Sequence, residues 1–462
     1  MSAKQLRACT AQTLIVPAAC LIFLTGPAGG AEKVFIEQKA SVFVDNVWTG
    51  ASMGFRMTTQ GSTQYVAYYD AEGWMTVASR SLDSEEWQRK KLDDQVRWDS
   101  HNYVTFGFDS EGHVHVSGNM HGSSLRYYRT TKPGDITSLV GIHTMTGRDE
   151  SRATYPRFFG GPNGEFLFTY RDGSAGSGRK IINVYDVKAR SWSRYIEKPL
   201  IDGQGKMGHY QSGPGRDRSG TYHLVWVWRD HSGCEMNHDV SYASSPETLE
   251  NWQKSDGTPI ELPLTIENAE TIDHVPVRAG LMNSVKLSFD AADRPMATYI
   301  KYDPRGSTQI YTMRLEGSRW KRYQTTTWTD RWEFSGGGSI KPMISFSGPA
   351  PFDESGRLYQ VFTNKFLAPY AQVRFLDPEK LQPLGQSIRL FPPGFDTPDP
   401  DKAADWQVNT SGFSVGRLFR DGRIWVLRWE AMAPNRDRPR ESVPPPSKLE
   451  VVELAIAEPS CG

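Results

Sequence analysis

The sequence has few cysteines and no net charge. Only 4 cysteines occur in 462 residues, and 53 basic side chains balance 53 acidic ones. Without an overall charge, the protein has no long-range field that would attract nucleic acid or an anionic membrane surface. We therefore expect neither as a partner, and we expect any anion to be recognised locally.

Hydrophobic residues concentrate at the start of the chain. Lys4 and Arg7 precede an apolar stretch, Thr13–Leu24, which is followed by small residues. This order is typical of a signal peptide, and the apolar stretch is short for a membrane span. We expect residues 1–31 to be a signal peptide, so that the mature protein is secreted or periplasmic and has no membrane anchor.

The mature chain has no disulfide framework and no obvious linker. Loss of the leader removes Cys9 and Cys20, so that only Cys234 and Cys461 remain. Two cysteines allow at most one disulfide. Because no Ser/Gly linker or run of like charges divides the chain, we expect residues 32–462 to form a single domain.

Aromatic residues and turn formers are abundant instead. The chain holds 14 Trp, 19 Tyr and 21 Phe beside 42 Gly and 29 Pro, a mixture that favours strands over helices. An aromatic-rich strand, an Asp/Gly turn and a second strand recur along the sequence. Seven repeats can be aligned, beginning near Tyr65, Val104, Glu165, Tyr222, Val285, Ser355 and Phe419.

The spacing of the repeats indicates the fold. The repeats lie about 60 residues apart, which suits four-stranded blades with insertions. Asp109 to Gly112 predicts a tight turn between two strands, because glycine tolerates a positive φ. We expect an all-β, seven-bladed β-propeller, although a β-sandwich or two barrels would also contain such hairpins. In a propeller, polar residues of several blades can meet at one mouth of the central channel.

Two histidines bracket the hairpin of the second repeat. His101 precedes its first strand and His121 follows its second. Because a hairpin brings its two ends together, we expect both imidazoles at one end of the blade. Histidine suits proton transfer near neutral pH, but turn-capping surface histidines would give the same pattern. Asn102, next to the first histidine, is a candidate ligand-binding residue.

The third repeat adds a tyrosine and an arginine by the same geometry. Tyr155 enters one strand and Arg171 lies at the end of the next, so both are expected near one rim. A guanidinium binds a planar carboxylate through two hydrogen bonds, and the small residues after Arg171 leave room for a ligand. Tyr155 alone would equally suit a buried, hydrogen-bonded tyrosine.

The fourth repeat supplies Tyr210 and Arg229 as candidate substrate-binding residues. Arg229 either contacts a carboxylate or sulfate of a ligand or forms an ordinary salt bridge with Asp230 or Asp239. Farther along, Arg331 precedes a run of glycines and is a candidate for flanking a sugar, with loop packing as the alternative.

The fourth repeat also contains residue types that zinc prefers, namely His209, Cys234 and His238. Their spacing is not a strong metal signal. If zinc is bound there, we expect it to be structural.

Several of these stretches together resemble a known family. The motifs are His101-Asn102, Asp109–His115, Met120-His121, Thr154–Pro156, Tyr170–Gly173 and Asn237–Tyr242. They resemble the BNR-repeat-containing propeller family that includes ulvan lyases and rhamnosyl-glucuronate lyases. The resemblance runs from about Trp48 to about Trp332.

The resemblance implies a polysaccharide lyase that cleaves a uronate- and rhamnose-containing glycan, such as ulvan or a plant gum, by β-elimination. It implies that His121 and Tyr155 move protons while His101 and Arg171 hold the uronate carboxylate. The residue types suit this chemistry, because positive donors stabilise the charge that develops when C5 loses its proton. Some members of the family carry zinc near the fourth repeat. No redox cofactor is required.

Two alternatives stay open. A glycoside hydrolase, rhamnosidase- or sialidase-like, needs a placed pair of carboxylates. Asp109, Asp172 and Asp239 all occur where turn-forming aspartates are expected, and the sequence alone assigns no sialidase-type arginine triad. The other alternative is a non-catalytic propeller that binds an acidic polysaccharide.

Overall fold

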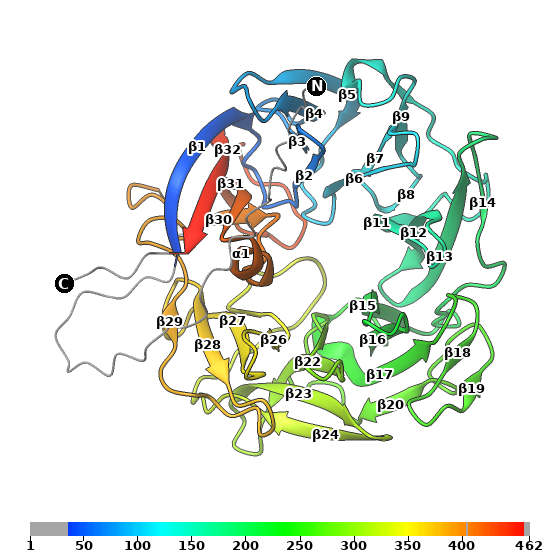
Figure 1. Cartoon of the computed structure of the whole chain (residues 1–462), viewed down its shortest axis with the longest axis vertical. Helices are drawn as coiled ribbons and strands as arrows, with labels where there is room; N and C mark the ends of the chain where they lie inside the picture. The colour runs from blue at the N-terminus through cyan, green and yellow to red at the C-terminus, as the bar shows by residue number, and fades with distance from the viewer. Residues whose placement is uncertain (1–35, 403–404, 457–462) are drawn as a thin grey trace, which may run out of the picture.

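Seven antiparallel sheets follow one another around a ring (Figure 1). The computed structural model describes residues 36–402 and 405–456. The expected signal peptide, residues 1–31, and Cys461 lie outside the described residues. The sheets confirm the predicted all-β, seven-bladed β-propeller. In the part of the chain that is described, no helix is both long and apolar enough to cross a membrane.

The first three blades each run from an inner strand at the channel to an outer strand. Blade 1 consists of β2 (Arg56–Gln60), β3 (Thr63–Tyr69), β4 (Trp74–Ser81) and β5 (Gln88–Gln95). Blade 2 consists of β6 (Val104–Phe108), β7 (Val114–Gly118), β9 (Tyr127–Thr130), the 3-10 helix η2 (Ile136–Ser138) and β10 (Leu139–Gly141). Blade 3 consists of β8 (His121–Ser123), β11 (Ala153–Gly160), β12 (Phe166–Ser174), β13 (Ser177–Asp186) and β14 (Ser191–Arg194).

The next three blades follow the same plan with small additions. Blade 4 consists of β15 (Gly208–Arg216), β16 (Tyr222–Arg229), the 3-10 helix η3 (Cys234–Met236), β17 (Asn237–Ser245), β18 (Trp252–Gln253), β19 (Pro259–Ile260) and β20 (Glu270–Asp273). Blade 5 consists of β21 (Lys286–Phe289), β22 (Pro295–Tyr302), β23 (Thr308–Glu316) and β24 (Arg319–Gln324). Blade 6 consists of β25 (Ile344–Phe346), β26 (Ala350–Pro351), β27 (Leu358–Asn364), β28 (Gln372–Leu376) and β29 (Ile388–Arg389).

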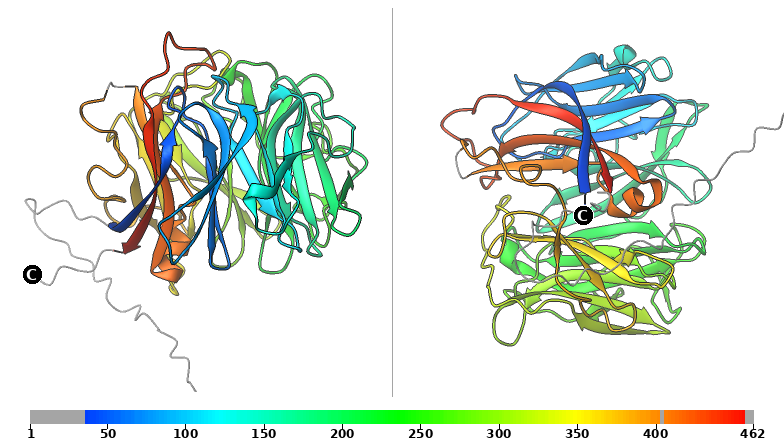
Figure 2. Two further views of the ribbon diagram at one scale, coloured as in Figure 1. Left: turned by 90° about the horizontal axis from the view of Figure 1, so that it is seen from above. Right: turned by 60° about the vertical axis from the view of Figure 1, so that its left-hand side comes forward.

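Blade 7 joins the two ends of the described chain. It consists of β30 (Trp406–Ser411), α1 (Val415–Asp421), β31 (Arg423–Met432), β32 (Ser447–Ile456) and β1 (Ile36–Val47). The first described strand, β1, pairs with the last, β32, and Figure 2 shows them side by side in blue and red. This pairing closes the ring, because the N-terminal strand completes the C-terminal blade.

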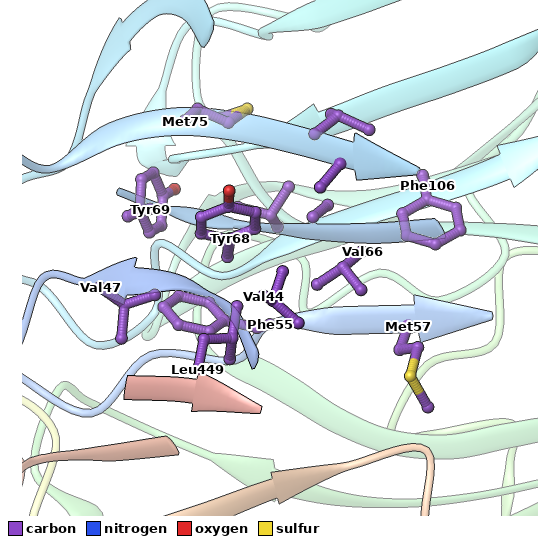
Figure 3. Packing of buried hydrophobic residues seen from close by; sticks show 14 of the residues in the cluster. Val44, Val47, Phe55, Met57, Val66, Tyr68, Tyr69, Met75, Phe106 and Leu449 are labelled. Atoms are coloured by element: carbon purple, nitrogen blue, oxygen red, sulfur yellow. The ribbon is translucent and has the colours of Figure 1, made fainter. Parts of the chain in front are cut away.

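Apolar side chains fill the space between neighbouring blades. Figure 3 shows the cluster shared by blades 7, 1 and 2. In this cluster the Phe55 ring stacks on Trp429 of β31, with ring centroids 4.5 Å apart. Successive strand residues point to opposite faces, and a middle strand meets a blade on each side, so β3 is buried at every position after Thr63. This explains why the repeats contain continuous apolar runs.

The sequence repeats fall in separate blades, as predicted. In the second, the turn between β6 and β7 forms because the Asp109 carboxylate accepts hydrogen bonds from the N–H groups of Glu111 and His113, at 3.0 and 2.9 Å. Gly112 has the expected positive φ, 83°.

The seventh repeat differs from the expected strand, turn and strand. Phe419 lies in α1, which the Ser414 side chain caps by accepting a hydrogen bond from the Arg417 N–H. Gly422, with φ 72°, ends the helix in the left-handed conformation. Only the second half of this repeat, in β31, is a strand.

Candidate functional site

A cavity of about 500 Å³ opens where loops of several blades meet at the channel. Six of the residues predicted from the sequence line it: His101, His121, Tyr155, Tyr210, Arg229 and Cys234. Lys286 of β21 adds another basic group. In the part of the chain that the structure describes, no aspartate or glutamate lines this cavity. The lining therefore favours an acidic ligand.

The short strand β8 fixes the position of His121. His121 pairs with Thr154 of β11, and the Gly122 N–H donates a hydrogen bond of 2.7 Å to the Thr154 hydroxyl. The chain leaving blade 2 is thereby tied to the inner strand of blade 3, and His121 lies close to Tyr155.

The two histidines meet as the hairpin geometry predicted. The His101 and His121 rings stack with centroids 4.0 Å apart. Asp99 joins them: one carboxylate oxygen lies 2.7 Å from His101 Nδ1, and the other contacts His121 Nδ1. With a proton on each Nδ1, both rings donate to the same carboxylate.

A second carboxylate reaches His101 from the last blade. Asp437 lies in the loop between β31 and β32, with Oδ2 3.4 Å from His101 Nδ1. Burial alone would lower the pKa of His101, but the hydrogen bonds and charges of Asp437 and Asp99 outweigh it and raise this pKa to about 9. His101 is therefore a cation at neutral pH. Burial opposes ionisation of Asp99 as well, yet the two histidines hold the pKa of its carboxyl well below its usual range.

Tyr155 has a strained backbone. Its φ is 59°, at a register shift between Thr154 and Arg157. An aromatic residue seldom adopts this conformation, which costs about 1–3 kcal/mol and is found mainly at functional sites. The Tyr155 ring lies 5.8 Å from that of His101. Burial and the neighbouring Tyr210 raise the pKa of the Tyr155 hydroxyl above its usual value, so it keeps its proton.

Arg171 lies behind Tyr155 rather than on an open rim. It is 2% exposed, and its guanidinium carbon lies 4.9 Å from the centroid of the Tyr155 ring. Its Nε and Nη1 atoms have no hydrogen-bond partner among the described residues. A buried guanidinium with unused donors is costly unless an anion pairs with it.

Two further basic residues surround Arg171. Burial, with the cations Arg157 and Arg171, lowers the pKa of Lys180 to about 7. Burial, followed by the charge of Lys180, lowers the pKa of His209 to about 3, so this imidazole is neutral. This region between blades 3 and 4 thus has an excess of positive charge.

Arg229 and Tyr210 form a hydrogen-bonded pair in the cavity wall. Arg229 donates to the Tyr210 hydroxyl at 3.0 Å and to the Asn237 side-chain oxygen at 2.8 Å. The acids considered as its salt-bridge partners, Asp230 and Asp239, contact His238 instead, each at 3.1 Å. Arg229 is thus available to an acidic ligand.

The structure does not bring the three zinc-type residues of the fourth repeat together. Both ring nitrogens of His238 are occupied by carboxylates, and His209 Nδ1 contacts Gln211. Cys234 is buried with a free thiol. Over residues 36–402 and 405–456, the ligand-type side chains that lie together are Asp99, His101, His121 and Asp437. The contacts of His209, Cys234 and His238 do not fit a shared zinc ion.

Two predicted substrate-binding residues lie outside the cavity lining. Asn102 is buried, and its carbonyl oxygen accepts a hydrogen bond of 2.6 Å from the Tyr69 hydroxyl. Arg331 lies over the Tyr302 ring, 3.8 Å from its centroid, and bonds to Glu333. The structure places both in local packing contacts.

Asp99 and Asp437 were not predicted from the sequence. Asp99 stands two residues before His101, where its carboxylate also accepts the His101 backbone N–H at 2.9 Å. That spacing, Asp-x-His, was the available local signal. Asp437 has no such signal, because it reaches the site only through closure of the ring.

Comparison with known proteins identifies the family of the chain and structures that share its fold. A family model described as BNR repeat-containing family member matches residues 63–328, more than half of the chain. The ulvan lyase, short isoform, of Alteromonas sp. (strain LOR) is 25% identical over 163 residues. That match covers 28% of this chain and 29% of the lyase, so it spans less than a third of the relative's length.

Solved structures share the fold at low identity. The polysaccharide lyase Uly1 has a TM-score of 0.62 and 11% identity, over 91% of this chain and 99% of its own. A PL25 ulvan lyase has a TM-score of 0.60 and 14% identity, over 88% of this chain and 94% of its own. The same lyase was also solved bound to -[GlcA(1-4)Rha3S]-. These likenesses establish the propeller fold.

Proposed function

We propose that this chain, which belongs to the BNR repeat-containing family, is a polysaccharide lyase that cleaves a uronate-containing glycan by β-elimination. The observation that carries the proposal is the stacked His101–His121 pair, bridged by Asp99 and placed beside Tyr155. The ulvan lyases among its relatives, one solved with a glucuronate–rhamnose sulfate unit, favour a rhamnose–glucuronate substrate such as ulvan or a plant gum.

In this proposal His101 binds the uronate carboxylate in the cavity, and the buried Arg171 adds positive charge from behind Tyr155. His101 carries a positive charge below pH about 9, and Arg171 has two guanidinium nitrogens without partners. Loss of the C5 proton moves negative charge onto the carboxylate, so these cations stabilise the intermediate more strongly than the ground state. An uncharged sugar at the same position has no carboxylate, so these cations would not stabilise its reaction intermediate.

His121 removes the proton and Tyr155 returns one. Asp99 holds His121 through Nδ1, which leaves Nε2 as the acceptor for the C5 proton. The C5–H electron pair forms the C4–C5 double bond, the C4–O bond breaks, and the Tyr155 hydroxyl protonates the departing oxygen. His121 then loses its extra proton to water and the Tyr155 phenolate takes up a proton from water, which restores both residues. No electrons are gained or lost, so a redox cofactor is not required.

The alternatives are less well supported. A hydrolase needs two carboxylates that flank the glycosidic bond, whereas the lining of the cavity, within the described residues, carries none. The nearby acids Asp99 and Asp437 both contact His101. A purely binding propeller would not need a histidine pair bridged by a carboxylate.

Secretion of the protein after removal of residues 1–31 remains a prediction.

Digestion of ulvan, gum arabic and related glycans tests the proposal. The wild-type protein should release unsaturated uronates, which absorb in the ultraviolet. His121→Ala and Tyr155→Phe should each lower the rate by about 10²-fold or more, the usual contribution of general acid–base catalysis. Saturated products would favour the hydrolase, and binding without products in wild type and variants alike would favour the binding protein.

A further inference from the structure

Asp437 reaches the site from a loop that the closing blade contributes. The loop, residues 433–446, joins β31 to β32. The Asp437 side chain is 12% exposed and faces His101. It accepts hydrogen bonds from the Ser339 N–H at 2.9 Å and the Ser100 hydroxyl at 3.3 Å. Its carboxylate is therefore held at a defined place between blades.

The backbone around Asp437 is fixed as well. Arg436 and Asp437 have φ values of 54° and 57°, in the left-handed region. The Arg436 N–H donates to the Ser339 carbonyl at 2.9 Å, and the Arg440 guanidinium donates to the Gly50 carbonyl at 2.8 Å. Such strain persists only where surrounding contacts enforce it, and it is concentrated at functional positions.

We propose that Asp437 is a positioning residue of the site, which keeps His101 in its charged form so that this imidazole binds the uronate carboxylate. This inference rests on the proposed lyase function. It also places part of the site beyond residue 328, where the match to the family model ends.

The carboxylates around the two imidazoles are unequally shared. Asp99 contacts both rings, whereas Asp437 contacts His101. The other groups facing His101 are the His121 ring, the Tyr155 ring and the Ser339 hydroxyl, 3.3 Å from Nδ1. Two negative charges thus act on His101, while His121 shares one of them. This asymmetry gives the cationic role to His101 and the base role to His121.

The same four side chains have the chemistry of a metal site, but their spacing is that of hydrogen bonds. His101 Nδ1 and the Asp99 oxygen are 2.7 Å apart. Two ligands of one tetrahedral zinc ion, each about 2.0–2.2 Å from the metal, lie more than about 3 Å from each other. A shared proton therefore accounts for this contact better than a shared ion.

The test is the pH titration of His101 in wild type and Asp437→Asn, followed by NMR of the imidazole carbons. Asparagine tolerates left-handed backbone, so the loop should be preserved. Loss of the nearby charge should lower the His101 midpoint by about one unit or more. Glu441→Gln removes an exposed charge from the same loop and should leave the midpoint unchanged.

Activity provides a second readout. In Asp437→Asn the alkaline limb of kcat/KM should move to lower pH, with a loss of about twofold near pH 8 that approaches tenfold near pH 10, mostly in KM, and almost none near pH 6. An equal loss at every pH, or an unchanged His101 midpoint, would overturn the proposal. So would one equivalent of zinc that copurifies with wild type and is lost in Asp437→Asn.

The two proposals fail separately. If wild type yields no unsaturated uronate from any glycan but the His101 midpoint still falls in Asp437→Asn, the lyase function is wrong and the Asp437–His101 pairing stands. If wild type is an active lyase and the midpoint does not move, the role of Asp437 is wrong and the lyase function stands.

Discussion

His101 and His121 stack with their ring centroids 4.0 Å apart and share the carboxylate of Asp99. Elimination from a uronate needs one cation for the carboxylate and one base for the proton, and in the proposed mechanism His101 and His121 take these two roles.

Asp99→Asn tests the bridge between the histidines. The amide removes the negative charge and allows the rings to turn, so kcat should fall by about 10²-fold or more. Steady-state kinetics on a uronate glycan measure the effect. Asp83→Asn, at an exposed position of blade 1, is the matched control. Activity of Asp99→Asn within twofold of that control would contradict the assigned role.

The raised pKa of His101 links stability to pH. It is about 9 in the folded protein, against about 6.5 in an unfolded chain. The pairing therefore stabilises the fold fully below pH about 6.5, and this contribution is lost as the pH rises through about 9. Urea unfolding should show that His101→Gln costs about 3 kcal/mol more near pH 6 than near pH 10. A pH-independent cost would show that the pKa is not raised.

Lys180 is expected to destabilise the protein when no ligand is bound, because its ammonium group is buried beside two other cations. Burial beside Arg157 and Arg171 lowers its pKa to about 7, so the penalty is full below that pH and vanishes near the unfolded value of about 10.4. Lys180→Met should raise the free energy of unfolding by about 1–3 kcal/mol near pH 6. Lys188→Met, at an exposed position, should have little effect. Destabilisation by Lys180→Met would mean that the ammonium has a favourable partner.

Ring closure depends on packing between the first and last blades. Trp429 is 2% exposed and stacks on Phe55. Trp429→Ala should lower the free energy of unfolding by about 3–5 kcal/mol, because it leaves a large cavity. Leu82, which is 40% exposed, provides the control: Leu82→Ala should cost less than about 0.5 kcal/mol. Similar costs for the two variants would argue against this packing.

The sequence was most informative where structure is local. The repeats mark the blades because an Asp/Gly turn and an apolar strand are formed by neighbouring residues. Hairpin geometry also brought His101 and His121 together correctly. It did not show that Arg171 would be buried behind Tyr155, because burial depends on how blades 3 and 4 pack. The helix at Phe419 was missed because its signals, Ser414 and Gly422, also occur in turns.

Sequence patterns could not predict contacts between residues of the first and last blades. Asp437 is separated from His101 by more than 300 residues and meets it only because β1 and β32 close the propeller. Neither its neighbours nor a repeat marks it. His209, Cys234 and His238 belong to one repeat of the sequence, but the described structure does not bring them together, and His238 contacts two carboxylates.

Analysis of the products formed from rhamnose–glucuronate glycans tests the central claim most directly. Mass spectrometry and ultraviolet absorbance should detect oligosaccharides with a C4–C5 double bond at the non-reducing uronate, and His121→Ala should slow their release by about 10²-fold or more. Saturated oligosaccharides from the wild-type protein, or no products from ulvan, gum arabic and related uronate glycans, would contradict the account.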